Sequence, residues 1–117
     1  MSRRVLAVVP ELMFQTRIRE TARAAGVELE TISAGEAAEA SRRFRPDLVV
    51  FDLTDPGAFT AAAAIRADAT LAEVRLIGFY PHVDAALREV ALAAGIQPLP
   101  RSAFTTRLAA LLTGDAP

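Results

Sequence analysis

The regular alternation of two kinds of segment is the feature that most constrains the fold of this chain. Short apolar runs rich in β-branched residues recur five times, at Val5 to Val9, Val27 to Ile32, Leu48 to Leu53, Val74 to Tyr80 and Ile96 to Leu99. Longer alanine-rich stretches, with apolar positions three or four residues apart, lie between and after these runs. Such alternation predicts an α/β fold of five βα units, in which helices cover both faces of a parallel sheet and form a three-layer sandwich.

Glycines mark two of the expected junctions between a helix and the next strand. Ala24-Ala25-Gly26 and Ala93-Ala94-Gly95 each precede a β-branched residue, and glycine readily takes the left-handed conformation that ends a helix. Two further helices are predicted over residues 36 to 44 and 58 to 68. A last helix is predicted from one apolar stripe, formed by Phe104, Leu108, Leu111 and Leu112.

The apolar pattern of each strand predicts its place in the sheet. The first, third and fourth strands are continuously apolar, as expected of central strands that are buried on both faces. The second strand alternates between apolar and charged residues, and the fifth contains Pro98 and Pro100, which cannot donate hydrogen bonds within a sheet. Both therefore belong at edges, and the predicted strand order is 2-1-3-4-5, as in flavodoxin-like sheets.

Length, charge and cysteine content exclude several classes of protein. The 117 residues fit a single domain, with an expected core over about residues 4 to 112 and a tail over 113 to 117. The 13 basic and 14 acidic residues give no field that would attract nucleic acid, and no apolar run is long enough for a membrane span. Cysteine is absent, which excludes disulfides and thiolate sites. We therefore expect a cytoplasmic protein without nucleic-acid or membrane partners.

One segment resembles the signature of response-regulator receiver domains. In residues 46 to 57, PDLVVFDLTDPG, a Pro-Asp pair opens the third strand, an aspartate closes it and Pro-Gly follows. Residues 34 to 38, AGEAA, are similar to the start of the second helix in that family. The resemblance extends over roughly residues 4 to 112 and implies a CheY-like receiver with Asp52 at the phosphoacceptor position.

Other positions depart from the receiver pattern. The family binds Mg²⁺ through an acidic pair after the first strand, and orients the phosphoryl group with a strand-four hydroxyl and a strand-five lysine. The matching positions here are Val9 and Pro10, Phe79, and Arg101. A magnesium site would depend on Glu11 and Asp52 and would be weak or absent, so the resemblance implies a degenerate pseudo-receiver that needs no cofactor.

Ligands of open α/β sheets bind beyond the carboxyl ends of the strands. The polar residues expected in this crevice are Glu11, Asp52, Thr54, Asp55, Tyr80, His82 and Arg101. Asp52 could simply cap its own loop by accepting backbone hydrogen bonds. The simplest expected role for Arg101 is a salt bridge to Asp52 that holds one conformation. Asp84 is the expected N-cap of the helix that follows His82.

Three functions remain open from the sequence. The first is a non-enzymatic signalling module that binds protein partners in trans or forms a homodimer; the resemblance implies that strand four, helix four, strand five and helix five carry its binding face. The second is an active phosphoacceptor, in which Asp52 is phosphorylated, Glu11 and the Thr54 carbonyl assist Mg²⁺, and Arg101 binds the phosphoryl group. The third is a small-ligand flavodoxin-like domain. The missing acidic pair favours the first, for which we expect no enzymatic activity.

Overall fold

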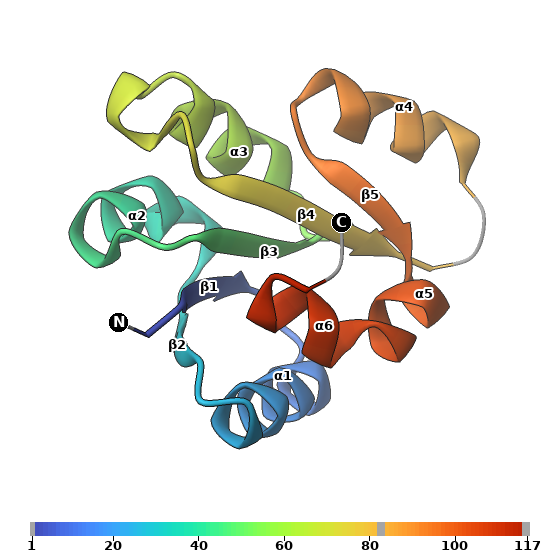
Figure 1. The fold of residues 1–117 in the computed structure, drawn as a ribbon. Helices are drawn as coiled ribbons and strands as arrows, with labels where there is room; N and C mark the ends of the chain where they lie inside the picture. Colours follow the sequence, from blue (N-terminus) through green and yellow to red (C-terminus); the bar gives the residue numbers. More distant parts are fainter. Residues whose placement is uncertain (1, 82–83, 116–117) are drawn as a thin grey trace.

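The sheet has the predicted topology. The computed structural model describes residues 2–81 and 84–115, and its five parallel strands lie in the order β2-β1-β3-β4-β5 (Figure 1). Each strand lies within one residue of its predicted bounds at either end: β1 (Arg4–Val8), β2 (Glu28–Thr31), β3 (Leu48–Asp52), β4 (Arg75–Tyr80) and β5 (Gln97–Pro100).

Helices cover both faces of the sheet. They are α1 (Leu12–Ala24), α2 (Ala37–Phe44), α3 (Ala58–Arg66), α4 (Ala85–Ala93), α5 (Arg101–Thr106) and α6 (Leu108–Thr113), with short 3₁₀ turns η1 (Ala34–Glu36) and η2 (Ala69–Leu71). Figure 1 shows α2, α3 and α4 on one face and α1, α5 and α6 on the other, so the three-layer prediction is confirmed. Within the described ranges, no helix is long and apolar enough to cross a bilayer.

Burial follows the predicted division into central and edge strands. Every residue of β3 is buried, and β1 and β4 are buried except at their first residue, whereas β2 is exposed or half-buried along its length. Successive residues of a strand face opposite sides of the sheet. Phe51 therefore packs under α2 and α3, whereas Phe79 and Phe104 belong to the core beneath α1, α5 and α6. The same alternation decides which residues reach the crevice.

The glycine junctions have the expected backbone conformation. Gly26 has a φ of 71° and Gly95 a φ of 77°, values that side chains rarely adopt. The chain passes through these residues from α1 into β2 and from α4 into β5. Both predicted helix ends are therefore confirmed.

The C-terminal helix differs from its prediction, because it is divided into α5 and α6. The backbone leaves helical values at Arg107, where φ is −99° and ψ is 7°. Thr105 and Thr106, whose branched side chains favour helix weakly, directly precede this break. The apolar stripe itself remains, since Phe104, Leu108, Leu111 and Leu112 are all buried.

The helix predicted over residues 58 to 68 also ends early, at Arg66. Asp68 instead caps η2, because its carboxylate accepts hydrogen bonds from the Thr70 amide at 2.9 Å and the Thr70 hydroxyl at 2.6 Å. Short acidic side chains often compete in this way with continuation of a helix.

Candidate functional site at the carboxyl edge of the sheet

Asp52 is the last residue of β3, and its carboxylate is bound by its own loop. The residue is 7% exposed. One carboxylate oxygen, Oδ1, accepts hydrogen bonds from the Thr54 amide at 2.9 Å and from the Thr54 hydroxyl at 2.7 Å. A buried carboxylate is costly unless such partners satisfy it. The contacts are therefore those expected of a loop-capping aspartate.

Apolar residues flank Asp52 on its face of the sheet. On β4, its partner in the strand register is Phe79, which is fully buried. On the other side Val9, which is 1% exposed, follows the register pair Val8–Phe51. Receivers carry a hydroxyl and an acid at the positions that match Phe79 and Val9. This environment gives the carboxylate no polar neighbour from either adjacent strand at its level.

Three phenylalanines from different elements pack together beside this edge. The ring of Phe79 stacks on that of Phe14 from α1, with 4.9 Å between centroids, and on that of Phe104 from α5, with 4.6 Å. Phe14 and Phe104 are 6.2 Å apart. We call these residues the aromatic cluster. Their stacking adds roughly 0.5–1.5 kcal/mol per pair to the free energy of burial, so the cluster fastens α1 and α5 to the sheet.

The predicted salt bridge between Arg101 and Asp52 is wrong. Arg101 is the exposed first residue of α5, and its guanidinium carbon lies 5.0 Å from the ring centroid of Phe14. A cation placed in this way is attracted by the electron-rich ring face. Asp52 meanwhile forms its hydrogen bonds with Thr54. Because Phe14 is packed in the aromatic cluster, Arg101 contacts its ring and not Asp52.

Glu11 also serves a local structural role. It is the N-cap of α1, where its side chain accepts hydrogen bonds from the amides of Met13 and Phe14. Its side chain also borders a hollow of about 270 Å³ together with Arg17 and Arg101. Asp52 is not among the residues that border this hollow. The two acids expected to share a metal ion therefore lie in different local environments.

The remaining predicted crevice residues are divided between separate places. Thr54 is the hydrogen-bond donor to Asp52, and Asp55 accepts a bond from the Gly57 amide at 3.0 Å. Asp55 borders a hollow of about 490 Å³ next to β1 and β2. Tyr80 does not face the crevice; it is 2% exposed and packs into the core beneath α2, α3 and α4. His82 lies outside the described residues.

A magnesium ion at this edge would find few acidic ligands. Mg²⁺ requires oxygen ligands in near-octahedral geometry. In the described part of the chain, no three acidic, histidine or cysteine side chains converge in a way that would hold a metal. Glu11 and Asp52 direct carboxylate oxygens at donors in their own loops.

The aromatic cluster was not identified from the sequence, although Phe14 and Phe104 are visible as apolar positions of helical patterns.

Sequence comparison finds no matching family model and no matching curated protein. Structural comparison does find neighbours. A response regulator from Hahella chejuensis is 21% identical, with a TM-score of 0.84 and 99% of each chain covered. The chemotaxis protein CheY4 of Vibrio cholerae is also 21% identical, with a TM-score of 0.84 over 99% of this chain and 100% of that one.

A third neighbour is the receiver domain of the sensor histidine kinase PA1611 from Pseudomonas aeruginosa PAO1. It is 23% identical, with a TM-score of 0.80, and the comparison covers 97% of this chain and 99% of that one. Its structure holds a magnesium ion in the active-site cleft. Agreement over almost the whole length, together with the observed strand order, shows that this chain has the CheY-like fold of response-regulator receiver domains.

Proposed function

We propose that this chain is a receiver-fold signalling module that acts by binding protein partners, without a phosphorylation cycle at Asp52. The observation that carries the proposal is the state of the Asp52 carboxylate. It is almost fully buried, receives two hydrogen bonds from Thr54 and lies between the apolar residues Val9 and Phe79. In this proposal the residue maintains the loop, and the module catalyses no reaction and needs no metal.

The chemistry of phosphoryl transfer supports this reading. A carboxylate nucleophile must be accessible, and the charge that develops on the transferred group must be met by fixed cations and hydrogen-bond donors. Here Arg101 lies over Phe14, and Phe79 stands at the level of Asp52. Apolar side chains thus lie where hydrogen-bond donors and a cation would be needed to stabilise a phosphoryl oxygen. The alternative, an active phosphoacceptor, is one of the two outcomes that the NMR titration described below distinguishes.

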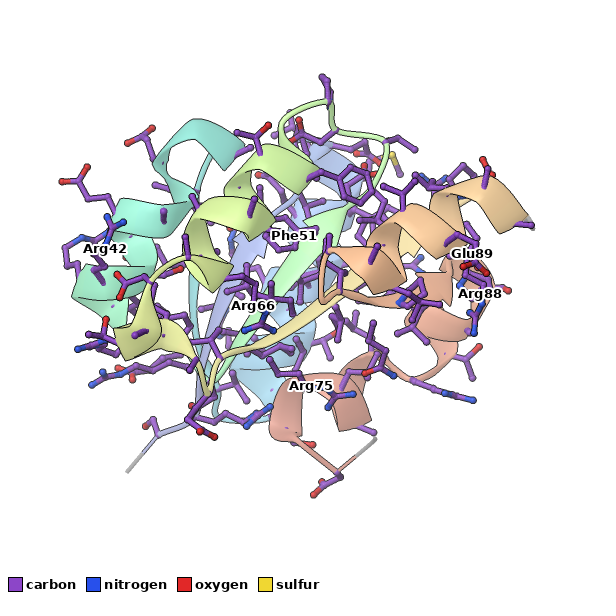
Figure 2. All side chains as sticks on the ribbon, turned by 90° about the horizontal axis from the view of Figure 1, so that it is seen from above. Arg42, Phe51, Arg66, Arg75, Arg88 and Glu89 are labelled. Atoms are coloured by element: carbon purple, nitrogen blue, oxygen red, sulfur yellow. The ribbon has the colours of Figure 1, made fainter. Side chains whose placement is uncertain are left out.

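Helix α4 supports a role in protein binding. Ala91 is its one buried residue, whereas Val90 is 51% exposed and Leu92 is 49% exposed. Arg88 and Glu89, labelled in Figure 2, lie on the same helix and are both exposed. Exposed apolar side chains mark an interaction surface where they lie close together, and Val90 and Leu92 lie on one short helix. We place the partner-binding surface on α4 and the adjacent strand β5, in a protein of the cytoplasm.

An NMR titration tests the proposed loss of phosphorylation. Amide shifts are followed on addition of Mg²⁺ and then of beryllofluoride, which mimics an acyl phosphate, for the wild type and for Asp52→Asn. We expect no shifts that extend from Asp52 to β5 in either protein. Such shifts in the wild type alone would restore the phosphoacceptor function.

The oligomeric state identifies the occupant of the α4 surface. Sedimentation equilibrium over a range of protein concentrations compares the wild type with Val90→Glu on α4 and with Leu12→Glu, a matched exposed position on α1. Self-association that Val90→Glu alone weakens would show that a second copy binds α4. A monomer at every concentration would exclude a second copy as the occupant of this surface, and weakening by Leu12→Glu alone would contradict the placement on α4.

A further inference from the structure

The hollow of about 490 Å³ beside β1 and β2 lies where ligands of such sheets usually bind. Its lining comes from the chain at and after the ends of β1, β2 and β3, together with Gln15 of α1 and Glu36 of η1. These three strands are neighbours, and the strand order reverses around β1 (Figure 1). Open α/β sheets bind ligands at such a point, and small-molecule sites usually have volumes of about 300–1,000 Å³.

Contacts between the surrounding segments fix the shape of the hollow. Gln15 Nε2 donates to the carbonyl of Val9 at 2.7 Å and to that of Pro10 at 3.4 Å, which joins α1 to the loop after β1. The loop after β3 lies directly against η1, because a Cβ atom on Gly57 would lie 2.8 Å from Cβ of Ala34. The walls of the hollow are therefore formed without a ligand.

The lining combines an apolar surface with groups that accept hydrogen bonds. Its apolar residues are Val9, Pro10, Ile32 and Ala34. Hydroxyl and amide side chains and two acids, Glu36 and Asp55, complete the lining, and none of its described residues is basic. A ligand that matches this lining has an apolar body and carries a positive charge.

The two carboxylates keep their negative charge, because their hydrogen-bond partners are neutral. Glu36 Oε1 accepts a hydrogen bond from the Ser33 hydroxyl at 3.0 Å, and Asp55 Oδ1 accepts one from the Gly57 amide at 3.0 Å. Within residues 2–81 and 84–115, neither acid forms an ion pair, and the second oxygen of each has no donor. The hollow therefore presents two carboxylate oxygens that are able to bind a cation.

Arg43 is the basic residue that borders a neighbouring hollow with Glu36, and it is bound by a different acid. That hollow has a volume of about 210 Å³. Arg43 donates through both terminal nitrogens to the two carboxylate oxygens of Glu30, at 3.1 and 2.5 Å. The hydrogen bond from Arg43 lowers the pKa of Glu30. Arg43 therefore neutralises Glu30 and leaves the charge of Glu36 to a ligand.

We infer that this hollow binds a small organic ammonium ion, whose charged group pairs with Glu36 and Asp55. An ammonium group has several N–H donors for carboxylate oxygens, and its hydrocarbon body matches the apolar part of the lining. A metal ion fits less well, since no three acidic, histidine or cysteine side chains of the described chain converge. The inference does not depend on the proposed function, because neither Asp52 nor any described residue of α4 lines the hollow.

An NMR titration at neutral pH and constant ionic strength tests the inference. Amide shifts of the full chain are followed with butylammonium chloride, with butanol as the uncharged control and ammonium chloride as the control without an apolar body. We expect saturable shifts around Gln15, Ile32, Glu36 and Asp55 with butylammonium alone. Equal affinity for butanol, the same shifts with ammonium chloride, or no saturable shifts with butylammonium would each overturn the inference.

Two variants remove charge from the hollow and retain its hydrogen bonds. Glu36→Gln keeps an oxygen for the Ser33 hydroxyl, and Asp55→Asn keeps one for the Gly57 amide. We expect each to weaken butylammonium binding about tenfold, the loss of one charge-assisted hydrogen bond. Glu39→Gln, at an exposed acid of α2 that does not line this hollow, is the control and should bind like the wild type. Wild-type affinity in both lining variants, or equal weakening by Glu39→Gln, would contradict the assigned site.

Discussion

The two ends of the sheet use their charged residues in opposite ways. At the carboxyl edge, Asp52 and Asp55 accept hydrogen bonds within their own loops. At the amino edge, Arg3 and Arg45 donate to the backbone carbonyls of Leu112 and Thr70, which belong to distant segments. The receiver fold thus positions the carboxyl edge for chemistry, but the residues placed there decide whether chemistry occurs. In this chain the acids at the usual site are held locally, whereas the arginines at the opposite end join segments that are distant in the sequence.

The aromatic cluster gives the largest expected effect if the carboxyl edge is structural. Phe79→Ala should lower the free energy of unfolding by about 3–5 kcal/mol, because a fully buried ring is lost between two others. Urea denaturation measures the change. Leu12→Ala, at a residue that is 74% exposed, is the control and should change stability by less than about 0.5 kcal/mol. A loss below about 1 kcal/mol for Phe79→Ala would mean that the cluster is loosely packed.

A close approach within the sheet should give the next largest effect. A Cβ atom on Gly78 of β4 would lie 2.5 Å from Cδ2 of Leu53, the residue that follows Asp52. Gly78→Ala should therefore destabilise the protein by about 1–3 kcal/mol, since buried Leu53 would have to move. Gly35→Ala is the matched control, because nothing lies within 4 Å of a Cβ atom there. Equal thermal stability of the two variants would contradict tight packing at this edge.

Substitution of Asp52 directly tests whether the residue is structural. Asp52→Ala leaves the Thr54 amide and hydroxyl without their acceptor and should cost about 1–2 kcal/mol. Asp52→Asn retains an oxygen in that place, so it should lower the free energy of unfolding by less than half as much. Urea denaturation at neutral pH compares the two. If Asp52→Ala instead increased stability, the carboxylate would resemble a residue kept for function at the expense of stability, and the contrast between the two edges would fail.

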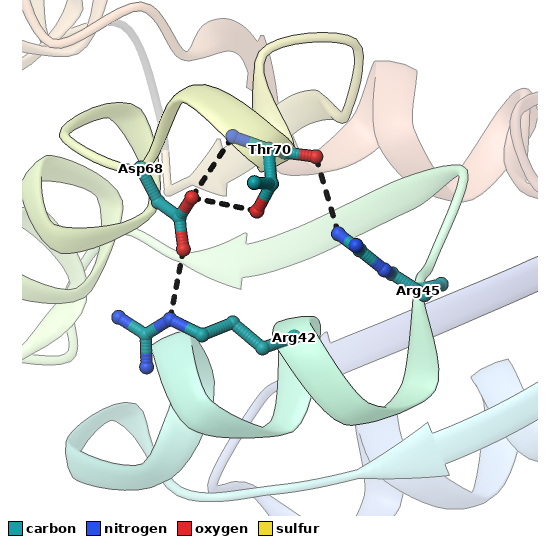
Figure 3. A network of polar contacts seen from close by, with 4 residues as sticks. All are labelled: Arg42, Arg45, Asp68 and Thr70. Carbon is teal, nitrogen blue, oxygen red and sulfur yellow. Dashed lines mark hydrogen bonds and ion pairs between the residues drawn. The ribbon is translucent and has the colours of Figure 1, made fainter.

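The smallest expected effect concerns Asp68, whose carboxylate is bonded by Arg42 and Thr70. Hydrogen bonds from the Thr70 hydroxyl, from Arg42 and from the Thr70 amide lower the pKa of Asp68 from 3.8 to about 2 (Figure 3). Since the folded pKa lies below the unfolded value, the stabilisation is complete above about pH 4 and is lost as the pH falls through about 2. Carboxyl ¹³C chemical shifts should show this low midpoint.

The source of this low pKa can be checked with a single hydroxyl. Thr70→Val should raise the Asp68 midpoint, because it removes the hydroxyl whose hydrogen bond contributes most to the lowered pKa. Thr21→Val on α1, whose hydroxyl bonds to the Arg17 carbonyl, is the control and should leave the Asp68 midpoint unchanged. A wild-type midpoint near the ordinary aspartate value would show that the network does not hold in solution.

The fold was predictable because its signals are local. Strand burial, the two glycine junctions and the prolines of β5 each follow from the residues of one segment. The place of Asp52 at the end of β3 was predictable for the same reason. The break at Arg107 was harder to predict, because one continuous helix and two short helices would bury the same apolar stripe through Phe104 and Leu108.

Partners of the site residues could not be predicted, because they depend on packing between distant segments. Arg101 was expected to pair with Asp52, and only the approach of α1 to α5 places Phe14 beneath it. A hollow of about 690 Å³ at the amino edge, lined in part by arginines, also has no local pattern in the sequence. Arg3, Arg45 and Arg75 meet because the starts of β1, β3 and β4 lie at one edge of the sheet.

The composition of the edge strands has a consequence for assembly. Pro98 and Pro100 of β5 have no amide hydrogen, so half of that strand cannot donate to an added strand. At the other edge, Glu28 and Glu30 of β2 form ion pairs with Arg4 at 3.2 Å and Arg43 at 2.5 Å, and charged edges discourage strand pairing. The sheet is therefore protected against extension into intermolecular β-structure, and any complex of this protein should form through helix surfaces.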